Sequence, residues 1–156
     1  VKPELLVLDE PTSALDVSVQ AQLLNLLEDL QEELGLAQLF ISHDLRTVQY
    51  LSHRIGAMYF GRLVELGPSD SVAKHRLHPY TRALFAAMPG QGGGKRPWQL
   101  LESGKPPDPL DPPRGCAFFS RCPNAEPGRC DVEDPRLLEV ADGSHHRVAC
   151  WHPCED

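Results

Sequence analysis

Residues 5–16 read LLVLDEPTSALD, and this stretch decides the fold of the N-terminal part of the chain. Its first four residues, Leu5 to Leu8, form an uninterrupted apolar run of strand length. Such a run is typical of a strand in a parallel sheet, where both faces are covered. Two adjacent carboxylates, Asp9 and Glu10, follow the run. Because open α/β sheets bind ligands at the carboxyl ends of their strands, this pair marks a candidate site.

Strand and helix signals alternate after this stretch. Residues 11–16 are typical of a turn, and apolar residues then recur at helical spacing over residues 19–34, ahead of Gly35. Residues 39–41 form a second short apolar run, and we expect a helix to follow it and to end near Leu51. The order strand, helix, strand, helix predicts an α/β fold with a right-handed crossover.

Two further elements are expected downstream of these four. Residues 55–60 and 63–66, separated by Gly61 and Arg62, have the pattern of a hairpin. Residues 80–88 have the pattern of a short helix.

The distribution of proline divides the chain into segments. Four of the fifteen prolines lie in residues 1–88 and eleven lie in residues 89–156. Runs of Pro and Gly between residues 89 and 114 disfavour helix and central strand, so we predict a linker there. The predicted organisation is a first domain of residues 1–88, a linker of residues 89–114 and a small, irregular, cysteine-rich extension of residues 115–154.

The acidic pair and His43, which follows the second apolar run, suit nucleotide hydrolysis. Asp9 can hold Mg²⁺, since this ion prefers a few carboxylates together with phosphate oxygens and waters. Glu10 points elsewhere because strand side chains alternate, and it can accept a proton from an attacking water. His43, at the same edge of a parallel sheet, can hydrogen-bond the γ-phosphate or that water. For the acidic pair alone, a solvated acidic turn is the alternative interpretation.

Taken in order, these motifs resemble those of a known family. The stretch LLVLDEPTSALD resembles the Walker B strand and D-loop of ATP-binding-cassette ATPases, which have a P-loop α/β fold, and ISHD at residues 41–44 resembles their H-loop. The resemblance implies that Asp9 supports Mg²⁺, that Glu10 is the catalytic glutamate and that His43 contacts the γ-phosphate of ATP. It also places the cofactor-binding residues Ser13 and Asp16 in the D-loop, which contacts the opposing subunit.

The sequence departs from this family in its phosphate-binding motifs. Phosphate binding requires G-x-x-x-x-G-K-[ST] after a strand, since the amides and the lysine of that loop hold the phosphates. The chain contains no such motif, because Arg96 stands where Ser or Thr must follow Gly94 and Lys95. The family's Q-loop and signature segment, which precede the Walker B strand, are also missing. With Val1 as its first residue, we expect the chain to be a C-terminal fragment of such an ATPase.

Residues 78–81, HPYT, resemble a segment of the oligopeptide and dipeptide importer subgroup. From the residues alone, they indicate the packed start of a helix, with Pro79 at its first position. The subgroup implies an ATP-hydrolysing subunit of a peptide importer, peripheral on the cytoplasmic face of the plasma membrane. The implied partners are a second ATPase subunit, identical or homologous, transmembrane permease subunits and, indirectly, a substrate-binding protein.

Five cysteines lie in the last third of the chain. Their spacing is Cys116-x5-Cys122-x7-Cys130-x19-Cys150, and Cys154 lies four residues further on. Disulfides are disfavoured in a cytosolic chain, so thiolate ligation of zinc or of an iron–sulfur cluster is the favoured interpretation. So short a segment lacks a core of its own, and a bound metal would compensate for this. The gaps exceed the spacing of about two to four residues that zinc sites favour, which shifts the prediction toward a cluster.

The segments GCAFFSRCP and HRVACW resemble the cysteine-containing C-terminal extension of peptide-importer ATPases. The resemblance implies a [4Fe–4S] cluster, with Zn²⁺ as the alternative metal, bound by Cys116, Cys122, Cys130 and Cys150. Cys154 and His152 are further candidate ligands. His145 and His146 are expected to be surface residues and not ligands.

Charge and composition exclude other function classes. The formal net charge of −7 repels phosphate backbones, so no nucleic-acid partner is expected. No apolar run approaches the length of about 18 residues that spans a bilayer, and the N-terminus lacks a signal-peptide pattern, which predicts a cytosolic chain. Two other functions stay open: the ATPase of an importer for nickel or another small solute, and a stand-alone metal or redox module with a vestigial ATPase segment.

Overall fold

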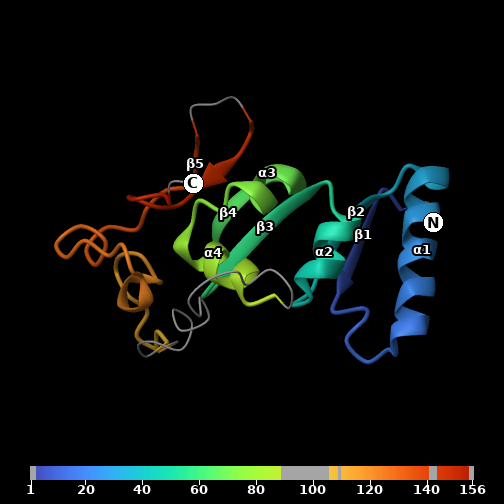
Figure 1. The fold of residues 1–156 in the computed structure, drawn as a ribbon, viewed down its shortest axis with the longest axis horizontal. Coiled ribbons are helices and arrows are strands. Elements are labelled where there is room, and N and C mark those ends of the chain that lie inside the picture. The colour runs from blue at the N-terminus through green and yellow to red at the C-terminus, as the bar shows by residue number, and fades with distance from the viewer. Residues whose placement is uncertain (1–2, 89–105, 109, 141–143, 155–156) are drawn as a thin grey trace. The chain divides into compact units, whose positions relative to one another are not determined.

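The computed structural model describes residues 3–88, 106–108, 110–140 and 144–154 (Figure 1). Most of the predicted linker, including Gly94, Lys95 and Arg96, lies outside the described residues. The chain forms two compact units, Val1–Ser52 and His53–Asp156, and each is described by itself.

The first unit has the predicted order of strand, helix, strand and helix. β1 (Leu5–Asp9) pairs in parallel with β2 (Ala37–Ile41), and α1 (Val17–Leu34) connects the two strands. α2 (Leu45–Leu51) follows β2. The predicted α/β class with parallel strands is therefore confirmed at the level of a mixed α/β fold.

Both ends of α1 are capped by residues whose chemistry explains the helix boundaries. The Asp16 carboxylate accepts a hydrogen bond from the Val19 N–H at 3.0 Å, which satisfies one of the free donors of the first turn. At the other end, Gly35 adopts φ 63°, a left-handed conformation that costs little without a side chain. Its N–H donates to the Gln31 carbonyl. The predicted end of the helix at Gly35 is confirmed.

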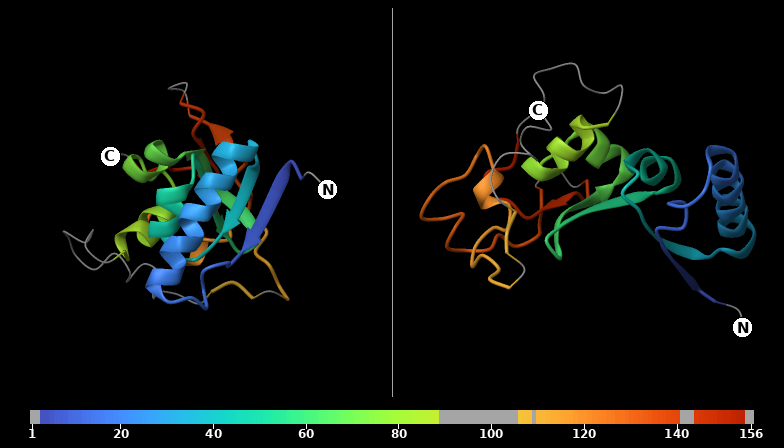
Figure 2. Two further views of the ribbon diagram at one scale, coloured as in Figure 1. Left: turned by 90° about the vertical axis from the view of Figure 1, so that its right-hand side faces the viewer. Right: turned by 90° about the horizontal axis from the view of Figure 1, so that it is seen from below.

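α1 and α2 cover one face of the two-stranded sheet, and both lie on the same side of the strands in Figure 2 (left). The side chains that pack together on this face are Leu6, Leu8, Leu23, Leu24, Leu27, Phe40 and Leu51. On the opposite face, Leu5 is 55% and Val7 is 56% exposed, and Leu39 and Ile41 are also exposed. The prediction that this strand is covered on both faces is therefore wrong for the described part of the chain, because both helices pack on the same side.

The second unit contains an antiparallel sheet with the strand order β3-β4-β6-β5. β3 (Arg54–Tyr59) and β4 (Arg62–Pro68) form the predicted hairpin. Its two-residue turn consists of Phe60 and Gly61, whose φ values of 50° and 76° suit the right-handed twist of the strands. The sequence pattern placed this turn one residue too late, since Arg62 already pairs with Tyr59.

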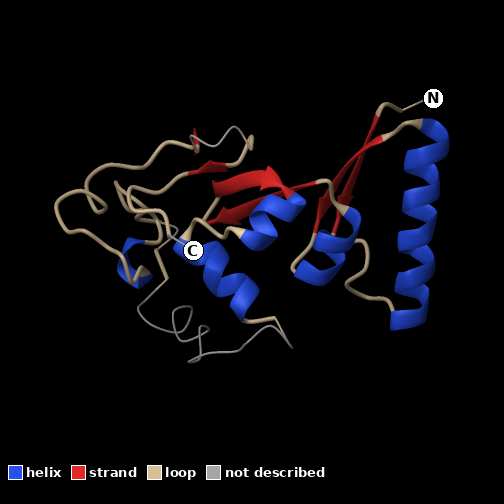
Figure 3. Cartoon of the chain, turned by 45° about the horizontal axis from the view of Figure 1, so that its top comes forward, coloured by secondary structure: helices blue, strands red, loops and turns tan. Residues whose placement is uncertain are grey.

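The remaining two strands of this sheet come from the cysteine-rich segment. β6 (Arg147–Val148) lies beside β4, with Glu65 opposite Val148, and β5 (Leu138–Glu139) lies beside β6. Apart from these strands and the 3₁₀ turn η1 (Phe119–Arg121), the described residues beyond residue 105 are mostly loop (Figure 3). The predicted division of the chain into domains and linker stays a prediction.

Two short helices follow β4. α3 (Ser69–Lys74) was not expected, because six residues are too few to show helical periodicity. α4 (Pro79–Ala86) corresponds to the helix predicted at residues 80–88 and begins one residue earlier. Pro79 lies in the first turn, where no N–H is needed, and His78 Nδ1 accepts a hydrogen bond from the Tyr80 N–H at 3.1 Å. The HPYT segment is thus a packed helix start.

An aromatic cluster forms the core of this second unit. The ring of Phe118, which is fully buried, has its centroid 5.2 Å from that of Tyr59, 5.6 Å from Tyr80 and 5.9 Å from His78. Aromatic pairs at such distances are more stabilising than their buried area alone implies. Because Phe118 lies two residues after Cys116, the cluster holds the first cysteine close to the HPYT segment.

His78 makes the stability of the second unit depend on pH. Burial lowers the pKa of His78 from 6.5 to about 4, so on acidification the unfolded chain takes up a proton before the folded chain does. The stability contribution of neutral His78 is therefore complete above pH 6.5 and is lost as the pH falls toward 4. We expect chemical denaturation to show a loss of about 1.4 kcal/mol in unfolding free energy per pH unit from this residue within that interval.

The matched control is His78→Asn, which keeps a capping side chain but does not titrate. The unfolding free energy of this variant should fall less over the same pH interval, since carboxylates elsewhere affect both chains equally. An identical pH dependence for the two proteins would contradict the assignment.

Candidate active site

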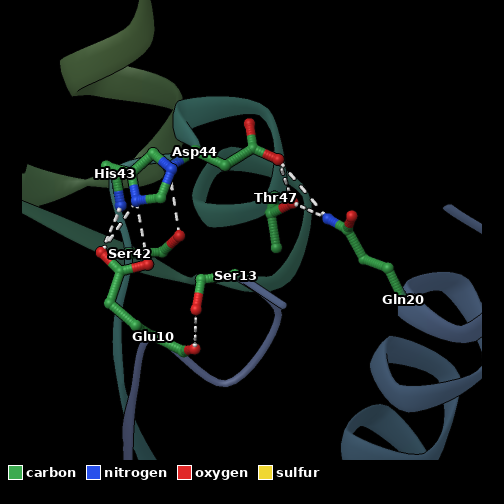
Figure 4. A network of polar contacts seen from close by, with 7 residues as sticks. All are labelled: Glu10, Ser13, Gln20, Ser42, His43, Asp44 and Thr47. Atoms are coloured by element: carbon green, nitrogen blue, oxygen red, sulfur yellow. Dashed lines mark hydrogen bonds and ion pairs between the residues drawn. The ribbon is translucent and has the colours of Figure 1, made fainter. Parts of the chain in front are cut away.

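The carboxyl ends of β1 and β2 bring together two residues that lie 33 positions apart in the sequence. In the parallel register Asp9 is opposite Ile41, so Glu10 and His43 follow the two strand ends. The Glu10 N–H donates to the Ile41 carbonyl at 2.9 Å and extends the strand pairing by one bond. Figure 4 shows the Glu10 carboxylate and the His43 ring directed toward each other.

Glu10 has a left-handed backbone conformation, with φ 48°. For a residue with a side chain this conformation costs about 1–2 kcal/mol, so surrounding contacts must hold it. The Ser13 hydroxyl donates to the Glu10 carbonyl at 3.0 Å, and the Ser13 N–H donates to the same oxygen at 3.3 Å. Ser13 therefore stabilises the turn that directs the Glu10 side chain toward His43.

Two donor groups of His43 converge on the Glu10 carboxylate. The backbone N–H donates to Oε1 at 3.1 Å, and Nδ1 lies 2.9 Å from both Oε1 and Oε2. The hydrogen bond to Glu10, reinforced by the charge of its carboxylate, raises the pKa of His43 above 6.5. The His43 side chain is 78% exposed, so the ring is open to a further ligand. A carboxylate and an imidazole in contact can share a proton, which is what acid–base chemistry requires.

The other residues assigned to ATP lie at the end of β1 or in the turn that follows. Asp9 is the last residue of β1, and it is exposed. Its carboxylate oxygens fit Mg²⁺ by their chemistry. Asp16 caps α1, so its carboxylate has a structural role as well. The roles of Asp9, Ser13 and Asp16 toward a nucleotide stay predictions.

A polar network beside His43 was not foreseen from the sequence. Thr47 Oγ1 donates to Asp44 Oδ2 at 2.7 Å, and Gln20 Nε2 donates to Thr47 Oγ1 at 2.9 Å (Figure 4). The Thr47 hydroxyl is the main cause of a lowered pKa at Asp44. Asp44 also caps α2 by accepting from the Arg46 N–H. The network thus ties α1 to the start of α2, directly after His43.

The sequence contains a signal for only one member of this network. An Asp immediately before a helix is a typical capping residue, so the role of Asp44 follows from local pattern. Gln20 comes from another helix, and its contact with Thr47 exists only because α1 and α2 pack side by side.

All five cysteines belong to the second unit and are free thiols. The Cys116 N–H donates to the Cys130 carbonyl at 2.7 Å. Gly115 permits this close approach, because a Cβ at its position would clash with the same carbonyl oxygen. At the end of the segment, the Cys154 N–H donates to the Leu77 carbonyl at 2.7 Å. Backbone hydrogen bonds therefore hold the chain at Cys116, Cys130 and Cys154, and the Cys122 N–H donates to the Phe119 carbonyl at 3.1 Å.

Burial makes these thiols difficult to ionise. It is the main cause that raises the pKa of Cys122 to about 11 and that of Cys150 to about 12. Nearby thiols add to the increase, since Cys116 and Cys154 act on both and Cys130 acts on Cys122. The four predicted ligands thus lie in one neighbourhood. In the parts of the chain that the structure describes, however, no group of three or more His, Cys, Asp or Glu side chains is arranged to hold a metal ion, so the predicted cluster is unsupported.

The prediction that His146 is a surface residue is wrong. Its side chain is 1% exposed, and both ring nitrogens have buried or half-buried partners. Nε2 lies 2.8 Å from Glu65 Oε1, and Nδ1 lies 3.0 Å from Ser71 Oγ. The neighbouring His145 is 75% exposed, as expected. Local sequence does not distinguish these two adjacent histidines, since the partners that bury His146 are Glu65 and Ser71, which are distant in sequence.

Part of the second unit matches a known protein family. Residues 64–130 match a family model described as the C-terminal region of oligopeptide/dipeptide transporters. The matched range includes most of β4, the HPYT segment and three of the five cysteines.

Three relatives align with almost the whole chain. The probable peptide ABC transporter ATP-binding protein y4tS of Sinorhizobium fredii is 50% identical over 150 residues, which cover 96% of this chain and 42% of the relative. The oligopeptide transport ATP-binding protein AppF of Bacillus subtilis is 46% identical over 153 residues, 96% of this chain and 45% of the relative. Residues 64–130 of the chain thus match the oligopeptide/dipeptide transporter family, and 96% of the chain aligns with ATP-binding proteins of peptide transport.

A third relative, the di/tripeptide transport ATP-binding protein DppF of Pseudomonas aeruginosa, is 46% identical over 153 residues. That alignment covers 97% of this chain and 46% of the relative. The chain thus spans less than half the length of each of these three relatives.

The contact between Glu10 and His43 can be tested by titration. We expect NMR titration of the His43 ring to give a pKa above 6.5, because the carboxylate stabilises the imidazolium. Glu10→Gln removes the charge and should return the pKa toward 6.5.

Asp44→Asn provides the comparison, since the charge of Asp44 is only a minor cause of the raised pKa. This change should lower the pKa of His43 less than Glu10→Gln does. Equal effects of the two substitutions would show that general acidity of the sheet edge, and not the direct contact, governs His43.

Proposed function

We propose that this chain forms part of the ATP-hydrolysing subunit of a peptide importer, with Glu10 as the catalytic base. The observation that carries the proposal is the 2.9 Å contact between Glu10 and His43 at the carboxyl edge of a parallel strand pair. Nucleotide hydrolysis needs a proton acceptor and a group that contacts the phosphate at such an edge. The relatives support the same function, since their names combine peptide transport with ATP binding.

Each residue at the sheet edge has a distinct proposed role. Asp9 would hold Mg²⁺, which supplies positive charge against the phosphate oxygens when it is bound. The Glu10 carboxylate accepts the proton of the attacking water. His43 orients this carboxylate through two donor groups and presents its exposed ring to the γ-phosphate. Ser13 and Asp16 shape the turn that is assigned to the contact with the opposing subunit.

ATP binding requires residues beyond these. The 156-residue sequence contains no G-x-x-x-x-G-K-[ST] loop, and a carboxylate edge alone repels phosphate. We therefore propose that hydrolysis belongs to a protein of the relatives' full length, and we expect no ATPase activity from the 156-residue chain alone.

The proposed partners follow from the role as an ATP-hydrolysing importer subunit. A second ATPase subunit, identical or homologous, completes the nucleotide site. ATP binding and hydrolysis by this pair drive the permease subunits, and a substrate-binding protein delivers the peptide. No described helix combines the length and the apolar character needed to cross a membrane. The proposed location is peripheral, on the cytoplasmic face of the plasma membrane, through contact with the permease subunits.

The decisive experiment is Glu10→Gln in a full-length protein that contains this chain. The amide keeps the size of the side chain but cannot accept the proton, so steady-state ATPase activity should fall by about 10²- to 10⁴-fold. ATP binding, measured by equilibrium titration, should be retained.

The matched control is Glu33→Gln, which changes an exposed carboxylate on α1 and should leave ATP turnover unchanged. A loss smaller than about tenfold for Glu10→Gln would remove Glu10 from the role of catalytic base. Loss of ATP binding together with activity would instead indicate a structural role for this carboxylate.

For the cysteine-rich segment we propose a thiolate-bound [4Fe–4S] cluster. The proposal is argued from thiol chemistry: these four thiols lie with Cys154 in one electrostatic neighbourhood, and none of them is in a disulfide. Thiolate sulfur is the ligand such clusters use. Because the side chains are not arranged as a metal-holding group among the described residues, binding must reorient the thiols and remove their protons.

Anaerobic purification should therefore give protein with iron and acid-labile sulfide. Substitution of any one predicted ligand by Ser should lower the iron content, the four being Cys116, Cys122, Cys130 and Cys150. Cys154→Ser is the matched control and should leave the iron content nearly unchanged, because a cubane cluster needs four thiolates. One zinc without iron would refute the cluster, and metal-free protein would refute thiolate ligation altogether.

A further inference from the structure

Glu65 on β4 is a fully buried carboxylate that the proposed ATPase function does not use. Its Oε1 accepts from the Leu77 N–H at 2.9 Å and contacts His146 Nε2 at 2.8 Å. Its Oε2 accepts from the His78 N–H at 2.9 Å. Burial of a charge is unfavourable unless hydrogen bonds satisfy it, so these three donors are a requirement of the fold. Glu65 thereby joins β4, the start of α4 and β6.

His146 is held from several sides at this contact. Its Nδ1 meets the Ser71 hydroxyl of α3 at 3.0 Å. Its ring also lies against the backbone of Gly67, where a Cβ would come within 2.9 Å of His146 Cδ2. A side chain at residue 67 would therefore displace the ring. The Glu65–His146 contact thus has a single geometry that neighbouring elements enforce.

This contact continues directly to the last two cysteines. β6 follows His146 and pairs with β4, and the Ala149 N–H donates to the Val64 carbonyl at 2.8 Å, one residue before Cys150. Leu77 donates its N–H to Glu65 and accepts the Cys154 N–H at its carbonyl, at 2.7 Å. The backbone at Cys150 and at Cys154 is therefore positioned by groups that Glu65 organises.

The first cysteines depend on different contacts. Cys116 and Cys130 are bonded to each other through the backbone at 2.7 Å, and Gly115 permits that approach. Phe118 secures this loop in the aromatic cluster. None of the hydrogen bonds described for this loop involves the Glu65 carboxylate or the His146 ring.

We propose that the Glu65–His146 contact positions Cys150 and Cys154 against the HPYT segment and thereby sets the accessibility of these two thiols, separately from Cys116 and Cys130. The inference goes beyond the proposed ATPase and does not require a bound cluster. Its physical basis is local stability: a segment held by a buried, hydrogen-bonded charge opens less often than a loop on the surface.

The experiment measures the alkylation rate of each cysteine by N-ethylmaleimide, with peptide mass spectrometry, in the reduced 156-residue chain under a chelator. Glu65→Gln retains the side-chain size but replaces one acceptor oxygen by a donor that faces backbone N–H groups. We expect the rates of Cys150 and Cys154 to rise about tenfold or more, while those of Cys116 and Cys130 change by less than about threefold.

The matched control is Glu139→Gln on β5, which changes a carboxylate that is 38% exposed and pairs with His145. This variant should label at wild-type rates. If Cys150 and Cys154 keep their wild-type rates in folded Glu65→Gln protein, the proposal is wrong. A uniform rise at all five cysteines would also overturn it, because Glu65 would then support the whole unit.

If circular dichroism shows that Glu65→Gln does not fold, Ser71→Ala replaces it as the test. This change removes only the partner of His146 Nδ1 and leaves the Glu65 carboxylate in place. A selective rise at Cys150 and Cys154 of about threefold is expected, and unchanged or uniform rates refute the proposal. The chelator keeps the outcome independent of the cluster, and ATP is absent throughout.

Discussion

Parallel pairing of β1 with β2 is the constraint on which the candidate active site depends. Parallel strands present their carboxyl ends at one edge, and they require a crossover connection, which α1 supplies. Glu10 and His43 therefore lie in contact at this edge, although 33 positions separate them in the sequence. The caps at Asp16 and Gly35 determine the length of α1 and so contribute to this register. Glu10 has a left-handed backbone conformation that is locally unfavourable, so the contacts at this edge of the sheet must hold it.

The arrangement of the second unit depends on the buried carboxylate of Glu65, whereas that of the first unit depends on the pairing of two strands. A carboxylate with no exposure is costly, and Glu65 offsets the cost with two backbone donors and one imidazole. Those donors belong to segments that are distant in sequence, so the charge is satisfied only when they meet correctly. Hydrophobic packing around Phe118 stabilises the unit, whereas the charge selects which segments come together.

The first three residues of the HPYT segment each have a structural role in this arrangement. The His78 ring caps α4 and is kept neutral by burial, since its pKa is lowered to about 4. Pro79 occupies a position that needs no N–H, and Tyr80 packs 4.6 Å from Tyr59 between ring centroids. The backbone N–H of His78 also reaches Glu65. These residues therefore connect the hairpin to the cysteine-rich segment.

Sequence alone determined the order of elements in the first unit, because apolar runs and helical spacing are local signals. It also determined the residues at the strand ends, the helix end at Gly35 and the hairpin, whose turn was placed one residue late. The sequence did not predict α3, because six residues are too few to show helical periodicity.

Only the tertiary structure decided which polar groups are buried. The open face of β1 follows from two helices packing on one side, which no local pattern reports. The Gln20–Thr47 bond and the Glu65–His146 contact likewise join segments that are far apart in sequence. His145 and His146 are adjacent and identical in type, yet one is exposed and the other buried. Their difference arises from tertiary contacts, because the His146 ring meets Glu65 on β4 and Ser71 on α3, which lie far from it in sequence, whereas His145 reaches the exposed Glu139.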